Sequence, residues 1–145
     1  MNITVTGRNG RMGQSVLTAI DAEAKAEAHS THDIGEDLAT ALDGSDVVID
    51  FTLPTLTDEL IKNAVAKNTA LVIGTTGHSD DQRASILEAA KTIPIVHASN
   101  FSTGVNVLFH LTRKAAAILG NEAFDINPLS PLNGDLKLLT SKANS

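Results

Sequence analysis

The chain opens with a strand-like run that leads directly into a turn with three evenly spaced glycines. Residues 3–6 are apolar or β-branched, and Gly7, Gly10 and Gly13 follow in a GxxGxxG pattern. In a strand–turn–helix unit, the first glycine permits a tight turn and the second lets phosphates approach the backbone. The third allows close packing of the helix, whose N-terminus attracts a negatively charged pyrophosphate. The pattern favours a dinucleotide site, and an ordinary strand–helix turn is the alternative.

The composition excludes several classes of protein. The 145 residues include 11 basic and 17 acidic side chains, for a net charge of −6, and no cysteine. We therefore expect no binding to nucleic acid or membrane, no disulfide and no thiolate metal site. The five histidines lack metal-ligand spacing, and no apolar run is long enough to cross a membrane. Because the chain enters a strand without a secretory leader, we expect a cytoplasmic protein.

Strand-like apolar runs alternate with helical patterns through most of the chain. Strands are expected at 3–6, 26–31, 46–51, 70–73 and 94–97, and helices at 12–20, 37–42, 57–67, from 79 onward, and at 102–119. This alternation is typical of an α/β fold with a doubly wound, Rossmann-like parallel sheet. We predict a dinucleotide-binding domain at 1–126. An irregular C-terminal tail is expected at 127–145, with one marginal strand or turn at 136–139.

Small polar residues gather where the predicted strands end, which is where doubly wound sheets bind ligands. Asp33 follows the second strand, twenty residues after Gly13, where an acid can accept a hydrogen bond from a ribose hydroxyl. A solvated loop acid is the alternative for this position. Residues 50–54, 74–77 and 98–102 follow the next three strands and are rich in Gly, Thr, Ser or Asn.

Each of these segments also has a simpler explanation. Residues 74–77 can be a plain turn before a helix cap at Ser79, and Phe101 can be a core residue. Asn100 and Ser102 can serve only to cap the long helix. We favour the binding interpretation because the same chemistry recurs at four of the five strand ends.

Four segments resemble the dihydrodipicolinate reductase family, the 4-hydroxy-tetrahydrodipicolinate reductases of lysine biosynthesis. Residues 7–13, 50–54, 74–77 and 100–106 are similar to the family's signatures, in the same order and at similar spacing. The resemblance covers residues 1–126 and implies a domain that binds NADH or NADPH. It also implies hydride transfer from the nicotinamide to a cyclic dicarboxylate of the lysine and diaminopimelate pathway.

The resemblance also implies where the cofactor lies. The glycine turn would hold the pyrophosphate, Asp33 the adenosine ribose, and Phe51 and Thr52 the middle of the cofactor. Gly74, Thr76, Ser99 and Phe101 would flank the nicotinamide. The expected cofactor-binding residues are Gly7, Gly10, Arg11, Met12, Gly13, Asp33, Phe51, Thr52, Gly74, Thr75, Thr76, Ser99, Asn100 and Phe101.

NADH is expected to be slightly preferred over NADPH. Asp33 can accept a hydrogen bond from a 2′-hydroxyl, whereas a 2′-phosphate there would meet like charge. Against this preference, His32 and Arg8 are also placed where they can contact a phosphate.

The resemblance stops after residues 124–126, which are similar to the start of the family's next strand. The family's substrate-binding domain contributes a His-His-rich segment ending in a lysine and a Ser-Gly-Thr loop. Here no histidine follows His110, no Ser-Gly-Thr occurs, and Lys137 and Lys142 lie in a different context. We therefore expect no catalytic residue in this chain and a missing substrate domain.

Three interpretations follow from this departure. The chain is the cofactor-binding part of an NAD(P)-dependent oxidoreductase, truncated, rearranged or repurposed, or it is a non-catalytic nucleotide-binding module or sensor. A different two-domain Rossmann dehydrogenase without its partner domain is the third. In each case the apolar face of the helix at 102–119 is expected to self-associate or to bind a partner chain.

Overall fold

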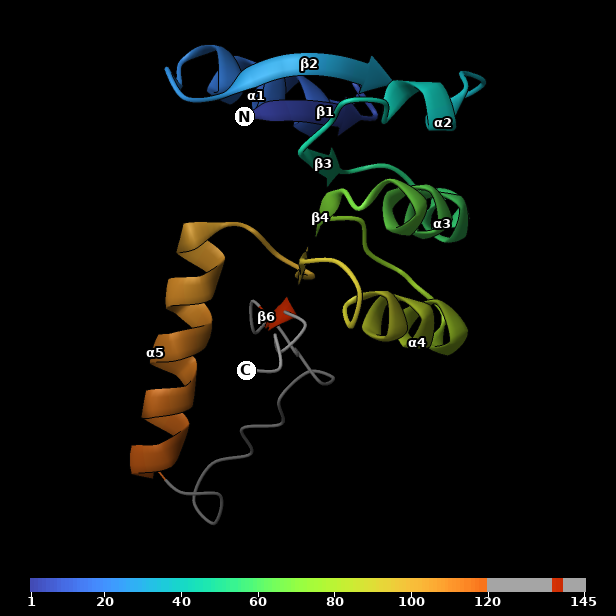
Figure 1. The fold of residues 1–145 in the computed structure, drawn as a ribbon. Helices are drawn as coiled ribbons and strands as arrows, with labels where there is room; N and C mark the ends of the chain where they lie inside the picture. Colours follow the sequence, from blue (N-terminus) through green and yellow to red (C-terminus); the bar gives the residue numbers. More distant parts are fainter. Residues whose placement is uncertain (120–136, 140–145) are drawn as a thin grey trace, which may run out of the picture. The chain divides into compact units, whose positions relative to one another are not determined.

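The computed structural model describes residues 1–119 and 137–139, which belong to two compact units. The first contains residues 1–97 and strand β6, and the described part of the second is residues 98–119. The first unit is built on a six-stranded sheet in the order β2-β1-β3-β4-β5-β6 (Figure 1). Its strands are β1 (Asn2–Thr6), β2 (Glu27–His32), β3 (Val47–Asp50), β4 (Ala70–Ile73), β5 (Ile95–His97) and β6 (Lys137–Leu139).

The helices follow the strands in the predicted alternation. They are α1 (Arg11–Asp21), α2 (Leu38–Ala41), the 3-10 helix η1 (Pro54–Leu56), α3 (Thr57–Lys67), α4 (Asp80–Ala89) and, in the second unit, α5 (Thr103–Leu119). Strands β1 to β5 pair in parallel, which confirms the doubly wound α/β prediction. The chain turns outward from β1 to β2 and then crosses back to β3. The topological switch point therefore lies between β1 and β3.

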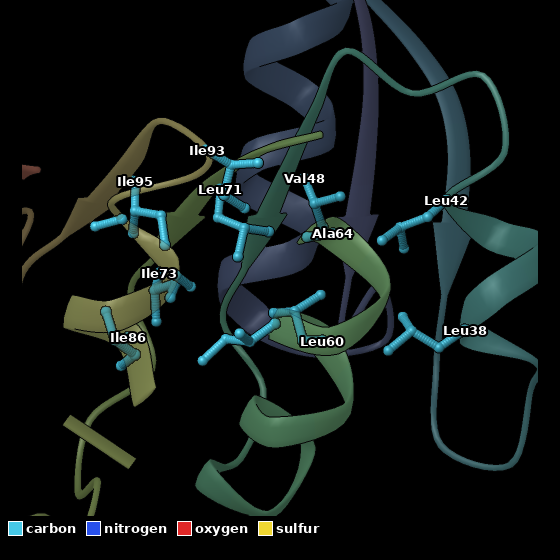
Figure 2. Packing of buried hydrophobic residues seen from close by; sticks show 13 residues of the cluster. Leu38, Leu42, Val48, Leu60, Ala64, Leu71, Ile73, Ile86, Ile93 and Ile95 are labelled. Atoms are coloured by element: carbon cyan, nitrogen blue, oxygen red, sulfur yellow. The ribbon is translucent and has the colours of Figure 1, made fainter. Parts of the chain in front are cut away.

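Alternate strand residues point to opposite faces, and each face packs on different helices. Val48 of β3 joins a large apolar cluster with α2, α3 and α4 (Figure 2). Its neighbour Ile49 packs instead against a smaller cluster in which Ile3 and Val5 of β1 meet Ile20 of α1. The larger cluster includes Leu60, Leu71 and Ile86, each 0 or 1% exposed, so it forms the main core. Burial on both faces explains why the central strands read as continuous apolar runs.

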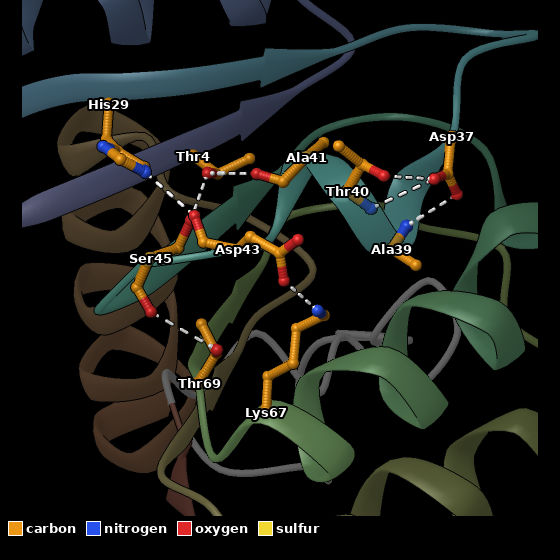
Figure 3. Close-up of polar contacts among 10 residues, drawn as sticks. All are labelled: Thr4, His29, Asp37, Ala39, Thr40, Ala41, Asp43, Ser45, Lys67 and Thr69. Carbon is orange, nitrogen blue, oxygen red and sulfur yellow. Dashed lines mark hydrogen bonds and ion pairs between the residues drawn. The ribbon is translucent and has the colours of Figure 1, made fainter.

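Polar contacts fix both ends of the segment between β2 and β3. The Asp37 carboxylate accepts the backbone N–H groups of Ala39 and Thr40 and so caps α2 after the carboxyl end of β2. Lys67 at the end of α3 forms an ion pair with Asp43 in the turn before β3 (Figure 3). This ion pair lies on the amino-terminal side of β3, away from the strand ends where ligands of such sheets bind.

Most predicted boundaries are correct to within a residue or two. The predictions for α3 and β4 match the structure, and β2 begins one residue later than expected. The marginal strand expected at 136–139 is β6, which pairs antiparallel with β5 and so adds an edge to an otherwise parallel sheet. The expected strand at 124–126, the helix end at Gly120 and the domain boundary at 126 lie outside the described residues. No helix in the described part of the chain combines the length and apolarity needed to cross a membrane.

Candidate functional site

A cavity of about 830 Å³ opens at the carboxyl ends of β1, β2 and β3, beside the switch point. Its lining comes from the glycine turn, the segment after β2, the segment after β3, and the start of α3. The lining residues are Gly7, Gly10, His32, Asp33, Ile34, Gly35, Glu36, Phe51, Thr52, Leu53, Thr55, Leu56 and Glu59. Five of the predicted site residues therefore meet around one space: Gly7, Gly10, Asp33, Phe51 and Thr52.

The glycine turn is packed so tightly that two of its glycines have no alternative. Gly7 adopts a φ of +74°, and its N–H donates to the carbonyl of His32 at 2.9 Å. A Cβ on Gly13 would lie 2.1 Å from the carbonyl oxygen of Gly7 and 2.9 Å from Cα of Arg8. Only glycine fits at position 13, which agrees with the packing role expected for it. The turn is thereby pulled against the start of α1.

The N-terminus of α1 is left open by its own sequence. Gly10 is the N-cap residue, no side chain in the described structure caps the helix there, and the first turn contains no acidic residue. The first N–H groups of a helix have no partner within the helix, and they carry partial positive charge. Arg11 and Met12 are exposed at this end, with Met12 47% accessible. The open N–H groups at the start of α1 can therefore bind an anion.

Asp33 lies at the cavity and faces the glycine turn. Its Oδ2 accepts the N–H of Asn9 at 2.9 Å, and its Oδ1 accepts the N–H of Ile34 at 2.8 Å. These backbone donors, with a smaller contribution from the Arg8 guanidinium, lower the pKa of Asp33. The residue is therefore an anionic acceptor that also ties the end of β2 to the turn after β1.

Glu36 is a lining residue that the sequence analysis did not identify. Its carboxylate forms a two-pronged ion pair with Arg8, with one contact from Arg8 Nη1 to Glu36 Oε2 at 2.5 Å. Oε2 also accepts the N–H of Asp33 at 2.9 Å. The hydrogen bond from Arg8 is the main reason that the pKa of Glu36 falls to about 2. The phosphate-contacting role considered for Arg8 therefore competes with this pair.

A buried carboxylate joins the ends of three neighbouring strands. Asp50 is 1% exposed and accepts hydroxyl hydrogen bonds from Thr6, Thr52 and Thr75, each at 2.6 Å. The hydroxyl of Thr75 also accepts the N–H of Thr52 at 2.9 Å. Such satisfied networks keep a buried charge in place and fix local geometry. The hydroxyl of Thr75, a residue predicted to bind the cofactor, is therefore engaged by Asp50 and Thr52. An acidic residue at the end of a buried apolar strand is the sequence signal that could have identified Asp50.

Phe51 and Gly74 are coupled across β3 and β4. A Cβ on Gly74 would lie 2.0 Å from Cε1 of Phe51, so the aromatic ring occupies the space above the glycine. Thr76, two residues on, is exposed. The segments after β3 and β4 are therefore brought together, as the resemblance implies.

His78 and His97 form a second polar contact near these strand ends. His78 is 5% exposed, its Nε2 lies 2.9 Å from the hydroxyl of Thr57, and its ring meets that of His97 edge to face at 5.2 Å. Burial lowers the pKa of His78. His32 is the last residue of β2, as the expected surface or strand-end placement of the histidines allows, whereas His78 is buried in the turn before α4 and differs from it. In the described residues no group of three or more His, Cys, Asp or Glu side chains is arranged to hold a metal ion.

Ser99, Asn100 and Phe101 belong to the second unit. The Oδ1 of Asn100 accepts the N–H of Ser102 at 2.9 Å, and its Nδ2 donates to Asn106 at 3.2 Å. The hydroxyl of Ser102 accepts the N–H of Val105 at 3.4 Å. Asn100 and Ser102 therefore make capping contacts at the start of α5, as the simpler explanation requires, and Phe101 is 38% exposed.

Comparison with known proteins gives a single family. A family profile described as "Dihydrodipicolinate reductase, N-terminus" matches residues 1–101. A 4-hydroxy-tetrahydrodipicolinate reductase of Akkermansia muciniphila is 52% identical over 120 residues, covering 83% of this chain and 49% of the relative. That of Rickettsia akari is 40% identical over 130 residues, covering 87% and 53%. The chain thus spans about half the length of these relatives.

A solved structure supports the same fold. It is the dipicolinate-bound dihydrodipicolinate reductase from Paenisporosarcina sp. TG-14, similar with a TM-score of 0.68 and 21% sequence identity. The match covers 81% of this chain and 54% of that one. At 21% identity this similarity establishes the fold alone, so the chemistry of the site is argued from the residues of this chain.

Proposed function

Because the chain belongs to the dihydrodipicolinate reductase family through its N-terminal domain, we propose that it binds a pyridine dinucleotide at the β1/β3 switch point. The single observation that carries this proposal is the open N-terminus of α1 beside a cavity of about 830 Å³. The pyrophosphate would lie on the backbone of Gly10, Arg11 and Met12, where peptide N–H groups and the helix dipole favour negative charge.

The adenosine ribose is assigned to Asp33. This carboxylate lines the cavity and is anionic at neutral pH, because backbone donors lower its pKa. It can accept a hydrogen bond from a ribose hydroxyl, and it would repel a 2′-phosphate. NADH is therefore the proposed preferred cofactor, with NADPH the weaker one.

The remaining cofactor contacts follow the family resemblance. Phe51 and Thr52 line the cavity and are assigned to the middle of the dinucleotide. Within the first unit, Gly74 and Thr76 are assigned to the nicotinamide, which would supply a hydride when bound. Asp50 and its three threonine partners keep the strand ends in place for this binding.

The full reaction is proposed at the level of the family. Joined to a substrate-binding domain, this chain would act as the cofactor half of a reductase in lysine and diaminopimelate biosynthesis. The apolar residues Val107, Leu108 and Leu111 of α5 are 52–59% exposed, and we assign them to contact with that domain, a partner chain or a second copy. The absence of cysteine is compatible with the cytoplasm as the proposed location.

Titration of the purified chain with NADH and NADPH, followed by cofactor fluorescence, tests the binding proposal. A measurable dissociation constant for NADH supports it, and binding of neither cofactor would reject it.

A turnover assay separates the reductase from a non-catalytic module. We expect these 145 residues alone to bind cofactor and yet to reduce the family's cyclic dicarboxylate at a rate close to background. General acid catalysis typically contributes about 10²- to 10⁴-fold, and no histidine follows His110 to provide it. Normal turnover by this chain alone would show that a different group supplies the proton.

A further inference from the structure

We propose that Glu36 sets the choice between NADH and NADPH by occupying the guanidinium of Arg8 beside the adenosine end of the cavity. The inference rests on the proposed dinucleotide site and adds a residue that controls its specificity. It concerns only the contacts among residues 8, 31, 33 and 36, all within the first unit.

Glu36 lies at the cavity and also contacts Arg8. It lines the cavity, whereas among the described lining residues none is a lysine or an arginine. The guanidinium of Arg8 is directed to Glu36 through both terminal nitrogens, and Nη1 also lies 3.4 Å from the hydroxyl of Thr31. The cation nearest to Asp33 is thus already engaged by a carboxylate.

The charges around the cavity disfavour a 2′-phosphate. Asp33, Glu36 and Glu59 present three carboxylates to the space, and the first residue after Asp33 is the apolar, 86% exposed Ile34. A guanidinium recognises phosphate well through paired N–H donors, but only when those donors are available. Because the pKa of Glu36 is lowered to about 2, its carboxylate is ionised throughout the physiological pH range, and the pair with Arg8 is independent of pH there.

Glu36→Gln is the variant that separates charge from shape. Glutamine retains the length of the side chain and an oxygen that can accept the N–H of Asp33, while the ion pair with Arg8 is lost. Arg8 is then available to a 2′-phosphate. We expect the NADPH dissociation constant to fall by at least about tenfold, and that for NADH to change by less than about twofold.

Three further variants give the controls. Glu88→Gln removes the same charge from an exposed pair with Lys91 on α4, so it reports the effect of net charge alone. The double variant Arg8→Gln/Glu36→Gln should lose the gain in NADPH affinity. Arg8→Gln alone should leave NADPH binding within about twofold of the parent, since its guanidinium is already occupied.

The outcomes are distinguishable. A parent chain that binds neither cofactor rejects the proposed function, whatever the variants do. If the parent binds NADH, the Glu36 inference is overturned by an unchanged NADPH/NADH ratio in Glu36→Gln, by an equal shift in Glu88→Gln, or by a gain that survives in the double variant. A large loss of NADPH affinity in Arg8→Gln alone would also overturn it, independently of how well Glu36→Gln folds.

Discussion

The turns from β1 to α1 and from β4 to α4 both carry two glycines, yet they begin their helices in opposite ways. Gly7 and Gly77 each adopt a positive φ, of +74° and +87°. At α4, Ser79 caps the helix through a capping box with Gln82, and the first turn contains two acidic residues. At α1, the N-cap is Gly10, which has no side chain, and the first turn contains no acid. Helix α4 thus caps the N–H groups at its own N-terminus, whereas α1 leaves its N-terminal N–H groups open to a ligand.

This difference shows which part of a glycine-rich turn is informative. Positive φ is required at both turns, so glycine there reports only a tight bend. The residues at the N-cap and in the first helical turn decide whether peptide N–H groups are occupied. The comparison therefore predicts that substitutions at the N-cap of α1 change binding, whereas substitutions at the N-cap of α4 change only stability.

The largest effect is expected for Gly13→Ala, which would force the start of α1 away from its turn. A Cβ at 2.1 Å from the carbonyl oxygen of Gly7 meets backbone that cannot yield, so we expect a loss of about 3 kcal/mol in the free energy of unfolding. Urea denaturation measures it. Gly104→Ala in α5, where the nearest atom lies 3.9 Å from the added Cβ, is the control and should be neutral or stabilising. Equal stability of both variants would contradict the close packing.

Next in size is the effect of Gly10→Val on cofactor affinity. A branched side chain at this N-cap would stand where the phosphates approach, so the NADH dissociation constant should rise at least tenfold, or about 1.4 kcal/mol. Ser79→Val places the same side chain at the N-cap of α4 and should leave NADH affinity unchanged. Fluorescence titration measures the NADH dissociation constants of both variants. Parent-like affinity in Gly10→Val would mean that the pyrophosphate site is misplaced.

Most of the fold was predictable because it depends on local periodicity. The pattern of Leu60, Ile61 and Ala64 gave α3 its correct bounds, and Asn68 ends that helix in the left-handed conformation. The bounds of β2 are harder to predict, since its sequence is polar and only one of its six residues, His32, is buried, so no clear alternation appears. The antiparallel pairing of β6 joins residues 95 and 139, a contact that no local pattern reveals.

The site was predictable where a residue type is required by its own backbone and unpredictable where it depends on a distant partner. Gly13 could be identified from its spacing alone. Glu36 becomes informative only through Arg8, which lies 28 residues away in the chain. Asp50 likewise depends on the hydroxyl donors Thr6 and Thr75, which are 44 and 25 residues away. In the sequence Thr6 looks like an ordinary strand residue, and Thr75 looks like a ligand-binding residue. Tertiary pairings therefore account for what sequence reasoning missed.

The smallest expected effect is that of Ser79→Ala, which tests the capped N-terminus of α4. Ser79 Oγ accepts the N–H of Gln82 at 3.2 Å, and Gln82 Oε1 accepts the N–H of Ser79 at 3.1 Å. Removal of the hydroxyl leaves one of these donors to water, so the free energy of unfolding should fall by about 1 kcal/mol. The acidic first turn of α4 also repels anions, so NADH affinity should stay within about twofold of the parent.

Ser85→Ala is the matched control for this last variant, because Ser85 is exposed in the interior of the same helix. The same chemical change there removes no cap and should be neutral or slightly stabilising, since alanine is the better helix former. Thermal and urea denaturation of both variants would isolate the capping contribution from that of helix propensity. A rise in NADH affinity on opening α4 in this way would show that an uncapped N-terminus attracts the cofactor wherever it occurs. Unchanged affinity would instead support binding at α1 and its cavity, where open peptide N–H groups, the glycine turn and Asp33 meet in the described part of the chain.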